Sequence, residues 1–383
     1  MSVPDLSSLA TPCYVYSAAV MRRQYARLAN ALAGYGVFYS LKANPHREVV
    51  RILLRAGAGA EVSSLGELET ALAAGCAPDD IVYVAPAKPP ATVARAVSAG
   101  IHAIACDCPE DLELCERAAW QAGRDVRLLL RINTNERPTG REKMVGGPGK
   151  FGFDEEEAAA QVRAVGLGRC RIAGIQVYSS SQVLDADWLG GHFGYVAELA
   201  RQLAGELGTR LETVDFGGGF GLPYAPDEPE LDLAAVGAAA AAARASLPRD
   251  CRLLVESGRF LVAEAGTFLT RVVRVKRSRG RVIVITDGGM NAFSRPVVMR
   301  VQHEARIANK PGWPATTTCD VCGPICTPID CLARDVRLPE PEPGDVIAIA
   351  NAGAYGFSMS LVQFMSLAAP AELLVEDDGS APG

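Results

Sequence analysis

In the stretch Thr213-Val214-Asp215-Phe216-Gly217-Gly218-Gly219, a short run with β-branched residues is followed directly by three consecutive glycines. Short β-branched runs that are flanked by turn residues are typical of buried parallel strands. Seven more runs in the 383-residue chain have this character. They are Val37 to Leu41, Ala58 to Val62, Ile81 to Val84, Ile101 to Ala105, Val126 to Ile132, Ile172 to Val177 and Arg252 to Val255.

Helical stretches alternate with these runs, among them Gly66 to Ala74, Pro109 to Ala122 and Trp188 to Leu207. A strand, a helix and a further parallel strand form a right-handed unit, and eight such units close a (β/α)8 barrel. The sequence therefore predicts an α/β fold built on a TIM barrel. In such a barrel the active site lies at the carboxyl ends of the strands.

The residues at those strand ends indicate a phosphate-bearing cofactor. They are Lys42, Arg131, Tyr178, Gly217 to Gly219, and Glu256 to Arg259. A lysine among glycine-rich turns, with an arginine opposite, fits an aldehyde cofactor that forms a Schiff base and whose phosphate is held by backbone N–H groups.

Each of these residues also has a plainer explanation. The glycines lack a Cβ and so let N–H groups approach phosphate oxygens, but three glycines also suit a flexible turn. Arg259 supplies a charged donor and Tyr355 a hydroxyl. Lys42 taken alone also fits a surface lysine, and Glu256 a carboxylate on the barrel rim.

After about Gly266 the pattern changes to strand upon strand, which predicts a second, antiparallel β-domain with polar, glycine and proline turns. The short run Thr11 to Tyr16 is expected to add a strand to it. We expect residues 1–30 to form an N-terminal strand that joins the C-terminal β-domain, residues 31–265 the barrel, and residues 266–383 the C-terminal β-domain. The expected later strands are Phe268 to Val275, Arg281 to Thr286, Cys319 to Cys322 and Val346 to Ala350.

Charge and hydropathy exclude several classes of protein. The formal net charge is −6 with both signs interspersed, so we expect neither nucleic-acid binding nor attraction to anionic lipid. No apolar stretch approaches ~18 residues, and Met1 to Pro12 lacks the features of a signal peptide. We therefore predict a cytoplasmic protein. The alanine run Ala238 to Ala243 is expected to be a surface helix, and the tail from Glu376 to Gly383 to be disordered.

Eleven cysteines are scattered through the presumed helices and strands, as is typical of reduced cytosolic thiols. Four of them, Cys319, Cys322, Cys326 and Cys331, fall close together and include a C-x2-C element that also suits zinc or an iron–sulfur cluster. Zinc sites usually separate two such elements by a longer loop. We predict no metal site and a catalytic Cys326, presented by the constrained loop of Gly323-Pro324 and Pro328.

Eight strings in one order resemble the fold-type III pyridoxal-phosphate decarboxylases, which include the diaminopimelate and ornithine decarboxylases. The resemblance spans roughly residues 10 to 366 and implies an alanine-racemase-like barrel. The strings are Tyr39-Ser40-Leu41-Lys42-Ala43-Asn44, Glu61-Val62-Ser63-Ser64 with Glu67, Lys150-Phe151-Gly152, Asp215-Phe216-Gly217-Gly218-Gly219, Glu256-Ser257-Gly258-Arg259, Asp287-Gly288-Gly289-Met290, Gly323-Pro324-Ile325-Cys326 with Asp330, and Gly353-Ala354-Tyr355.

The resemblance implies roles for single residues. Lys42 would carry pyridoxal 5'-phosphate, and Glu256 would pair with the pyridine nitrogen and keep it protonated, which makes the ring a stronger electron sink. Cys326 would return a proton to the carbon that loses CO2, and Asp330 would border the substrate. In relatives both reach across a dimer interface, so a homodimer with shared sites is expected. Besides Lys42 and Glu256, the implied cofactor-binding set comprises Tyr178, Ser181, Gly217, Gly218, Gly219, Gly258, Arg259 and Tyr355.

Departures from the family pattern concern the substrate. Tyr178 stands where relatives have a histidine that stacks on the cofactor, and it does not carry a proton in the neutral range. Thr327 stands where diaminopimelate decarboxylases have Glu and ornithine decarboxylases have Asp to receive a distal ammonium. Without that carboxylate a distal ammonium would be desolvated with no partner there. Arg295 is positioned to bind a distal carboxylate or phosphate, and Met299 replaces a tyrosine common in diaminopimelate enzymes.

The overall likeness is to the subgroup of secondary metabolism that acts on conjugated amino acids. That subgroup includes the butirosin-pathway decarboxylase of glutamate bound to an acyl carrier protein and the siderophore-pathway decarboxylases of citryl-diaminopropionate. We therefore expect decarboxylation of a small-molecule or carrier-tethered amino acid whose distal end is masked. The alternatives are a diaminopimelate decarboxylase of lysine biosynthesis and a catalytically inactive regulatory homologue. A racemase would be expected to have arginine in place of Glu256.

Overall fold

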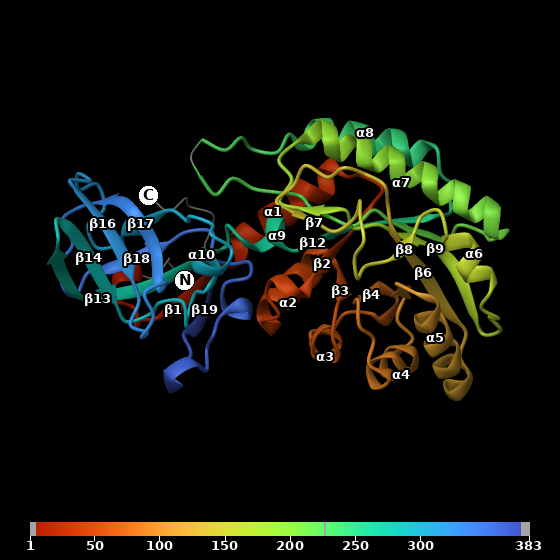
Figure 1. Cartoon of the computed structure of the whole chain (residues 1–383), viewed down its shortest axis with the longest axis horizontal. Coiled ribbons are helices and arrows are strands. Elements are labelled where there is room, and N and C mark those ends of the chain that lie inside the picture. The colour runs from red at the N-terminus through yellow and green to blue at the C-terminus, as the bar shows by residue number, and fades with distance from the viewer. Residues whose placement is uncertain (1–4, 226, 377–383) are drawn as a thin grey trace. The chain divides into compact units, whose positions relative to one another are not determined.

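The structure, a computed structural model, describes residues 5–225 and 227–376. The chain divides into two compact units. The barrel unit comprises Tyr25–Leu222 and Pro229–Gly258, and the β-unit comprises Met1–Gln24, Pro223–Glu228 and Arg259–Gly383. Figure 1 shows the chain coloured from its N-terminus in red to its C-terminus in blue.

Eight parallel strands close a barrel, which confirms the predicted fold. Adjacent strands pair in the order β5-β4-β3-β2-β12-β11-β9-β6, and β5 pairs with β6 to complete the ring. Each strand falls on one of the predicted runs within a few residues. The strands are β2 (Gly36–Ser40), β3 (Gly59–Val62), β4 (Ile81–Val84), β5 (Ala103–Cys106), β6 (Val126–Asn133), β9 (Cys170–Gln176), β11 (Thr213–Asp215) and β12 (Arg252–Ser257).

Helices follow the strands, and in Figure 1 α2 to α5 lie along one side of the barrel strands while α7 and α8 lie along the other. The sequence sets where they begin: Ser64 accepts a hydrogen bond from the Glu67 N–H, and Asp185 accepts one from the Trp188 N–H. The predicted alanine helix is α8 and is longer than its alanine run. The helices are α2 (Arg47–Ala56), α3 (Leu65–Ala73), α4 (Pro90–Ala99), α5 (Pro109–Ala122), α6 (Ala158–Arg163), α7 (Ala186–Leu207) and α8 (Leu233–Ala245).

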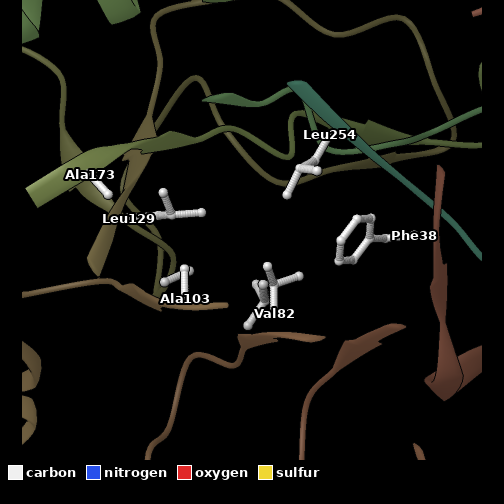
Figure 2. Close-up of a cluster of buried hydrophobic side chains, with 8 residues drawn as sticks. Phe38, Val82, Ala103, Leu129, Ala173 and Leu254 are labelled. Atoms are coloured by element: carbon white, nitrogen blue, oxygen red, sulfur yellow. The ribbon is translucent and has the colours of Figure 1, made fainter. Parts of the chain in front are cut away.

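The interior of the barrel is filled by one layered cluster of side chains (Figure 2). Large residues alternate with small ones, so Phe38 and Leu129 fit beside the alanines of β5 and β9. Gly59 is required for this packing, since a Cβ there would lie 2.7 Å from the Phe38 ring. Truncation of Leu129 to alanine is expected to lower the free energy of unfolding by about 2–5 kcal/mol. The cluster comprises Phe38, Val82, Val84, Ala103, Ala105, Leu129, Ala173 and Leu254.

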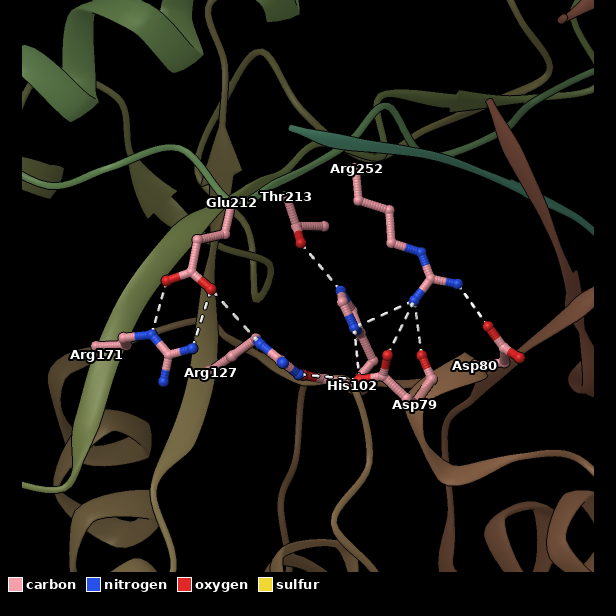
Figure 3. Close-up of polar contacts among 8 residues, drawn as sticks. All are labelled: Asp79, Asp80, His102, Arg127, Arg171, Glu212, Thr213 and Arg252. Carbon is pink, nitrogen blue, oxygen red and sulfur yellow. Dashed lines mark hydrogen bonds and ion pairs between the residues drawn. The ribbon is translucent and has the colours of Figure 1, made fainter. Parts of the chain in front are cut away.

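A polar network lies at the amino ends of the strands, at the end of the barrel opposite the predicted site (Figure 3). Thr213 and Arg252 are the first residues of β11 and β12. His102 Nε2 lies 2.9 Å from Thr213 Oγ1, and Arg252 is ion-paired with Asp80. Ion pairs at this end hold neighbouring strand starts together, a structural role in barrels of this kind. The network also includes Asp79, Arg127, Arg171 and Glu212.

The β-unit contains an eight-stranded sheet, and it is mixed rather than antiparallel as predicted. Most pairs are antiparallel, but β14 and β16 are parallel, as are β1 and β19. The long connection between β14 and β16 permits a parallel crossover, which a tight hairpin does not. The strands are β1 (Cys13–Ser17), β13 (Gly266–Ser278), β14 (Arg281–Thr286), β15 (Ala305–Ile307), β16 (Thr317–Cys322), β17 (Cys331–Leu338), β18 (Val346–Ile349) and β19 (Ala371–Val375).

Strand β1 comes from the N-terminal end of the chain and pairs with both β13 and β19. Cys13 and Val15 of β1 pack with Leu269, Val346 and Ala348 in the apolar core of the β-unit. Helix α1 (Ala18–Ala31) leads from β1 toward the first barrel strand.

Shorter elements complete the description. They are β7 (Glu142–Lys143), β8 (Phe153–Asp154), β10 (Ser180–Ser181), α9 (Arg259–Val262), α10 (Arg295–Val298) and the 3-10 turns Leu6–Ser8, Leu41–Ala43, Pro78–Asp80, Phe357–Met359 and Phe364–Ser366. Within the described ranges no helix has the length and apolar character of a membrane span. The first four residues of Met1 to Pro12 and, after Glu376, the tail predicted to be disordered lie outside the described residues.

Candidate active site

Lys42 lies in the 3-10 turn that follows β2, at the carboxyl end of the strand. Its Nζ is 2.8 Å from Oε2 of Glu61, whose side chain is fully buried while that of Lys42 is 37% exposed. The other Glu61 oxygen accepts a hydrogen bond from Ser63 Oγ at 2.9 Å. A buried carboxylate thus holds an accessible amine in place. The amine also lies 5.6 Å from the centre of the Tyr178 ring.

Glu256 is buried near the end of β12. Its Oε1 accepts a hydrogen bond of 3.0 Å from Gln176 Nε2, and its carboxyl group also shares a side-chain hydrogen bond with that of Asp215. Burial and the neighbouring carboxylates of Asp215 and Glu61 raise the pKa of Glu256 well above its ordinary value. Burial also raises the pKa of Asp215 to about 6. Such a carboxyl is suited to share a proton with a buried basic nitrogen.

The three glycines after β11 form a closely packed loop that tolerates no side chain. A Cβ would lie 2.2 Å from Val177 O at Gly217, 2.0 Å from Glu256 O at Gly218, and 2.5 Å from Ser180 O at Gly219. Gly217 and Gly219 also have φ of +62° and +99°, which glycine adopts at little cost. The loop is therefore a fixed backbone cradle and not a flexible turn. Backbone N–H groups in a fixed glycine turn suit a phosphate.

The residues around the glycine loop are buried or half-buried. Tyr178 follows β9 and is half-buried, and a Cβ at Gly218 would lie 3.3 Å from its ring. Ser181 is buried on β10, which pairs with β7. Gly258 packs against Ser40 and Ala43, on either side of Lys42, because a Cβ there would lie 2.8 Å from Ala43 Cβ. The predicted barrel residues are thus gathered at one end of the barrel, around Lys42.

In the β-unit, two buried arginines share two aromatic rings. Arg259 and Arg295 each lie within 6 Å of the ring centres of Tyr224 and Tyr355. Arg259 Nη1 donates to the Tyr224 hydroxyl at 3.2 Å. Tyr355 has a φ of +56°, a strained conformation for tyrosine that is often found at functional sites. Two neighbouring cations of this kind are suited to bind an anion.

His303 completes this cluster and stays neutral. Its ring packs against Tyr224 with centres 4.9 Å apart, and its Nδ1 lies 2.9 Å from Ala350 O. Burial lowers the pKa of His303 to about 3, and the nearby Arg295 and Arg259 act in the same direction. The positive charge of the cluster therefore comes from the arginines.

The loop between β16 and β17 presents Cys326, whose side chain is exposed. Asp330 holds this loop, since its carboxylate accepts hydrogen bonds from the Met290 N–H at 2.6 Å and the Ile325 N–H at 3.0 Å. Burial raises the pKa of Asp330, although the two N–H groups oppose this shift. Thr327 is half-buried, and its carbonyl accepts from the Asp330 N–H at 3.2 Å. The role of Asp330 toward a substrate stays a prediction; its visible contacts hold the loop.

The other clustered cysteines are not arranged around a metal. Cys322 and Cys331 are cross-strand neighbours on β16 and β17, and Cys319 is buried. In residues 5–225 and 227–376 no group of three or more His, Cys, Asp or Glu side chains is arranged so that it could hold a metal ion.

Sequence reasoning missed several residues of the site. Glu61, Gln176 and Asp215 had no role assigned, although Glu61 is a charged residue inside a short apolar run, which is a usable signal for a buried functional carboxylate. Tyr224 lies in a loop between the barrel strands, and no pattern in the sequence marks it.

Comparison with known proteins gives the family. The model of the "pyridoxal-dependent decarboxylase, pyridoxal binding domain" matches residues 18–263. The chain is 33% identical over 379 residues to L-glutamyl-[BtrI acyl-carrier protein] decarboxylase of Niallia circulans, covering 95% of this chain and 88% of the relative. It is 34% identical over 374 residues to diaminopimelate decarboxylase of Pseudomonas aeruginosa, covering 96% and 88%.

A solved structure of a diaminopimelate decarboxylase has the same fold as this chain. Diaminopimelate decarboxylase from Helicobacter pylori, complexed with L-lysine, superimposes with a TM-score of 0.88 at 31% sequence identity, covering 96% of this chain and 92% of that chain.

Proposed function

The chain belongs to the pyridoxal-phosphate-dependent decarboxylases that include the diaminopimelate decarboxylases, and on that premise we propose that it decarboxylates an amino acid whose distal end is masked. The candidate substrates are a glutamyl group tethered to an acyl carrier protein and a conjugated precursor of siderophore type. Such substrates place the enzyme in secondary metabolism. Thr327 carries this proposal, because a hydroxyl stands where a distal ammonium would need a carboxylate.

The residues of the barrel unit fit the cofactor. A fixed glycine turn without side chains suits the phosphate, the buried carboxyl of Glu256 suits a basic nitrogen, and the accessible amine of Lys42 suits an aldehyde. When bound, pyridoxal phosphate supplies the electron sink that stabilises the carbanion left by the departing CO2.

Each side chain of the site would then have a separate role. Lys42 would bind the cofactor covalently, with Glu61 orienting its amine. Glu256 would hold a proton at the ring nitrogen, with Gln176 fixing the carboxylate. Tyr178 would cover one face of the ring without exchanging protons at neutral pH. Arg259 and Tyr355 would add donors for the phosphate.

Cys326 and Arg295 would act on the substrate. The exposed thiol of Cys326 is the proposed proton donor to the carbon that has lost CO2. Arg295 would bind an anionic distal group such as a carboxylate or phosphate, since its guanidinium is buried and remains charged. We propose that two copies of the chain form a dimer in which Cys326 of one protomer serves the site of its partner.

The second candidate function is decarboxylation of free diaminopimelate, because diaminopimelate decarboxylases are about as similar to this chain as the carrier-protein enzyme is. The experiment that separates them measures CO2 release by the purified enzyme from free diaminopimelate, ornithine and lysine, from glutamyl-carrier thioester and from citryl-diaminopropionate. We expect turnover of a masked substrate and poor turnover of the free diamino acids. Efficient turnover of free diaminopimelate alone would establish the second candidate.

A further inference from the structure

A buried histidine joins three neighbouring strand ends of the barrel. His192 lies in the second turn of α7, and its side chain is almost completely buried. Its Nδ1 lies 2.9 Å from Oε1 of Glu136, which follows β6. Its Nε2 lies 3.0 Å from the carbonyl oxygen of Phe216, which follows β11.

These contacts fix the orientation of the histidine ring. The Phe216 carbonyl only accepts, so Nε2 carries a proton. Burial opposes ionisation of Glu136, but its hydrogen bonds with His192, Ser179 and Thr134 outweigh it and lower the pKa of Glu136. Glu136 therefore favours its carboxylate form, which is held among these three side chains. Trp188 stacks on the ring with centres 5.4 Å apart and planes 12° apart, which holds its orientation.

The carboxylate extends the connection to β9. Glu136 Oε2 accepts hydrogen bonds from Ser179 Oγ at 2.8 Å and from Thr134 Oγ1 at 3.1 Å. Ser179 directly follows Tyr178, the residue proposed to cover the cofactor ring. The pair of His192 and Glu136 thus holds the backbone beside Tyr178.

The same pair fixes the start of the glycine loop. The peptide between Phe216 and Gly217 is held at both sides, because its carbonyl accepts from His192 and its N–H donates to Asp215 Oδ1 at 2.9 Å. The next carbonyl, that of Gly217, accepts from the Glu256 N–H at 2.7 Å. The first peptide groups of the loop are thus fixed by His192, Asp215 and Glu256.

We propose that His192 and Glu136 are positioning residues for the cofactor, which set the glycine loop for the phosphate and Tyr178 for the ring as one rigid unit. The proposal rests on the proposed phosphate-binding role of Gly217 to Gly219.

The barrel offers a matched control at the other end of the same strand. His102 is also buried, and its Nε2 lies 2.9 Å from Thr213 Oγ1 at the start of β11, while its Nδ1 lies 3.3 Å from Asp79 (Figure 3). Replacement of His102 removes a similar pair of contacts far from the proposed phosphate loop. If replacing either histidine merely destabilises the barrel, both variants should behave alike, whereas an effect on cofactor binding should appear only on replacement of His192.

The experiment titrates cofactor-depleted enzyme with pyridoxal phosphate and with pyridoxal, which lacks the phosphate, and takes the ratio of the two affinities. In His192→Asn the side-chain amide stands in for Nδ1, so the contact with Glu136 is kept and the hydrogen bond to the Phe216 carbonyl is lost. In His192→Gln the amide stands in for Nε2, so the hydrogen bond to the Phe216 carbonyl is kept. We expect the ratio to fall roughly ten-fold in His192→Asn, as for the loss of one hydrogen bond, and less in His192→Gln. His102→Asn should leave the ratio unchanged.

Two further measurements make each outcome decisive. Glu136→Gln, which has a similar size but no charge, should lower the affinity ratio in the same direction as His192→Asn. A folded His192→Asn with the wild-type affinity ratio would overturn the proposal. The wild type tests the premise separately. Equal affinities of the wild type for pyridoxal phosphate and pyridoxal would mean that the phosphate role of the loop fails, whereas a wild-type preference for pyridoxal phosphate that His192→Asn retains in full leaves the loop's role intact and rejects that of His192.

Discussion

Gln176 and Glu256 form a buried pair in which Gln176 Nε2 donates to Glu256 Oε1 over 3.0 Å. The pair joins the last residue of β9 to β12, at the proposed cofactor end of the barrel. Burial and the neighbouring carboxylate of Asp215 raise the pKa of Glu256, and the two carboxyl groups share a side-chain hydrogen bond. A buried carboxylate needs an opposite charge. A protonated ring nitrogen would provide one.

Glu256→Gln is expected to lower kcat on the order of a hundredfold, because a neutral amide does not hold a proton at the ring nitrogen. The variant should still bind the cofactor through Lys42. Gln176→Met, which removes only the supporting donor, should have a smaller effect, roughly ten-fold. Steady-state kinetics with cofactor content measured in parallel checks this. Equal kcat values for Glu256→Gln and wild type would contradict the role of Glu256.

Lys42→Arg should fold with the stability of the wild type, because a guanidinium retains an ion pair with Glu61. Lys42→Ala should be less stable, because it leaves the buried Glu61 carboxylate without that partner. Neither variant should show the visible absorbance of covalently bound cofactor that borohydride removes in the wild type. A reducible band that persists in both would show that another residue binds the cofactor.

The side chain of Glu67 is expected to make the folded state less stable as the pH rises. Burial raises the pKa of Glu67 to about 7, so the folded state binds its proton more tightly than the unfolded state. The contribution of Glu67 to the free energy of unfolding is therefore fully present below its unfolded pKa, near 4.5, and is lost as the pH rises to about 7.

Denaturant unfolding of wild type and Glu67→Gln across this window measures the contribution. We expect the stability of the wild type relative to the variant to fall by on the order of 2 kcal/mol between those pH values. Glu69→Gln, which removes an exposed carboxylate from the same helix, controls for the loss of one charge. A pH-independent difference would mean that Glu67 titrates normally.

Subunit mixing tests the shared site. Lys42→Ala and Cys326→Ala should each be nearly inactive, and a mixed dimer would contain one intact site if Cys326 serves the partner. Random exchange makes half the dimers mixed, so about a quarter of the wild-type activity should return. The control is each variant exchanged with itself. No recovery after verified exchange would place the whole site within one chain.

The barrel could be predicted from the sequence because all eight strands are short runs bounded by turns, and because the helices begin at capping residues such as Ser64 and Asp185. The parallel pairing of β14 with β16 did not follow, because side-chain alternation along a strand is the same for either direction. The two-residue strands β7 and β10 were also missed, since two residues carry no periodicity.

Only some residues of the site could be predicted from the sequence. Lys42, Glu256 and the glycines stand at strand ends and belong to recognisable strings. His192 was missed because one histidine within an amphipathic helix has no distinguishing pattern, and its meaning comes from contacts with Glu136 and Phe216 that lie 56 and 24 residues away in sequence.

Thr327 gives the central claim its sharpest test. Thr327→Glu supplies a carboxylate for a distal ammonium, and it should raise kcat/KM for free diaminopimelate relative to the masked substrate. Thr327→Gln, which has a similar size and no charge, is the matched control and should not do so. An effect shared by both variants would be steric.

The most direct measurement is the ratio of kcat/KM of the wild-type enzyme for glutamyl-carrier thioester or citryl-diaminopropionate to that for free diaminopimelate, each followed by CO2 release. A masked distal end predicts a ratio well above one for at least one of the two masked substrates. A ratio below one for both, with diaminopimelate turned over at an ordinary kcat of roughly 1 to 1000 per second, would contradict it.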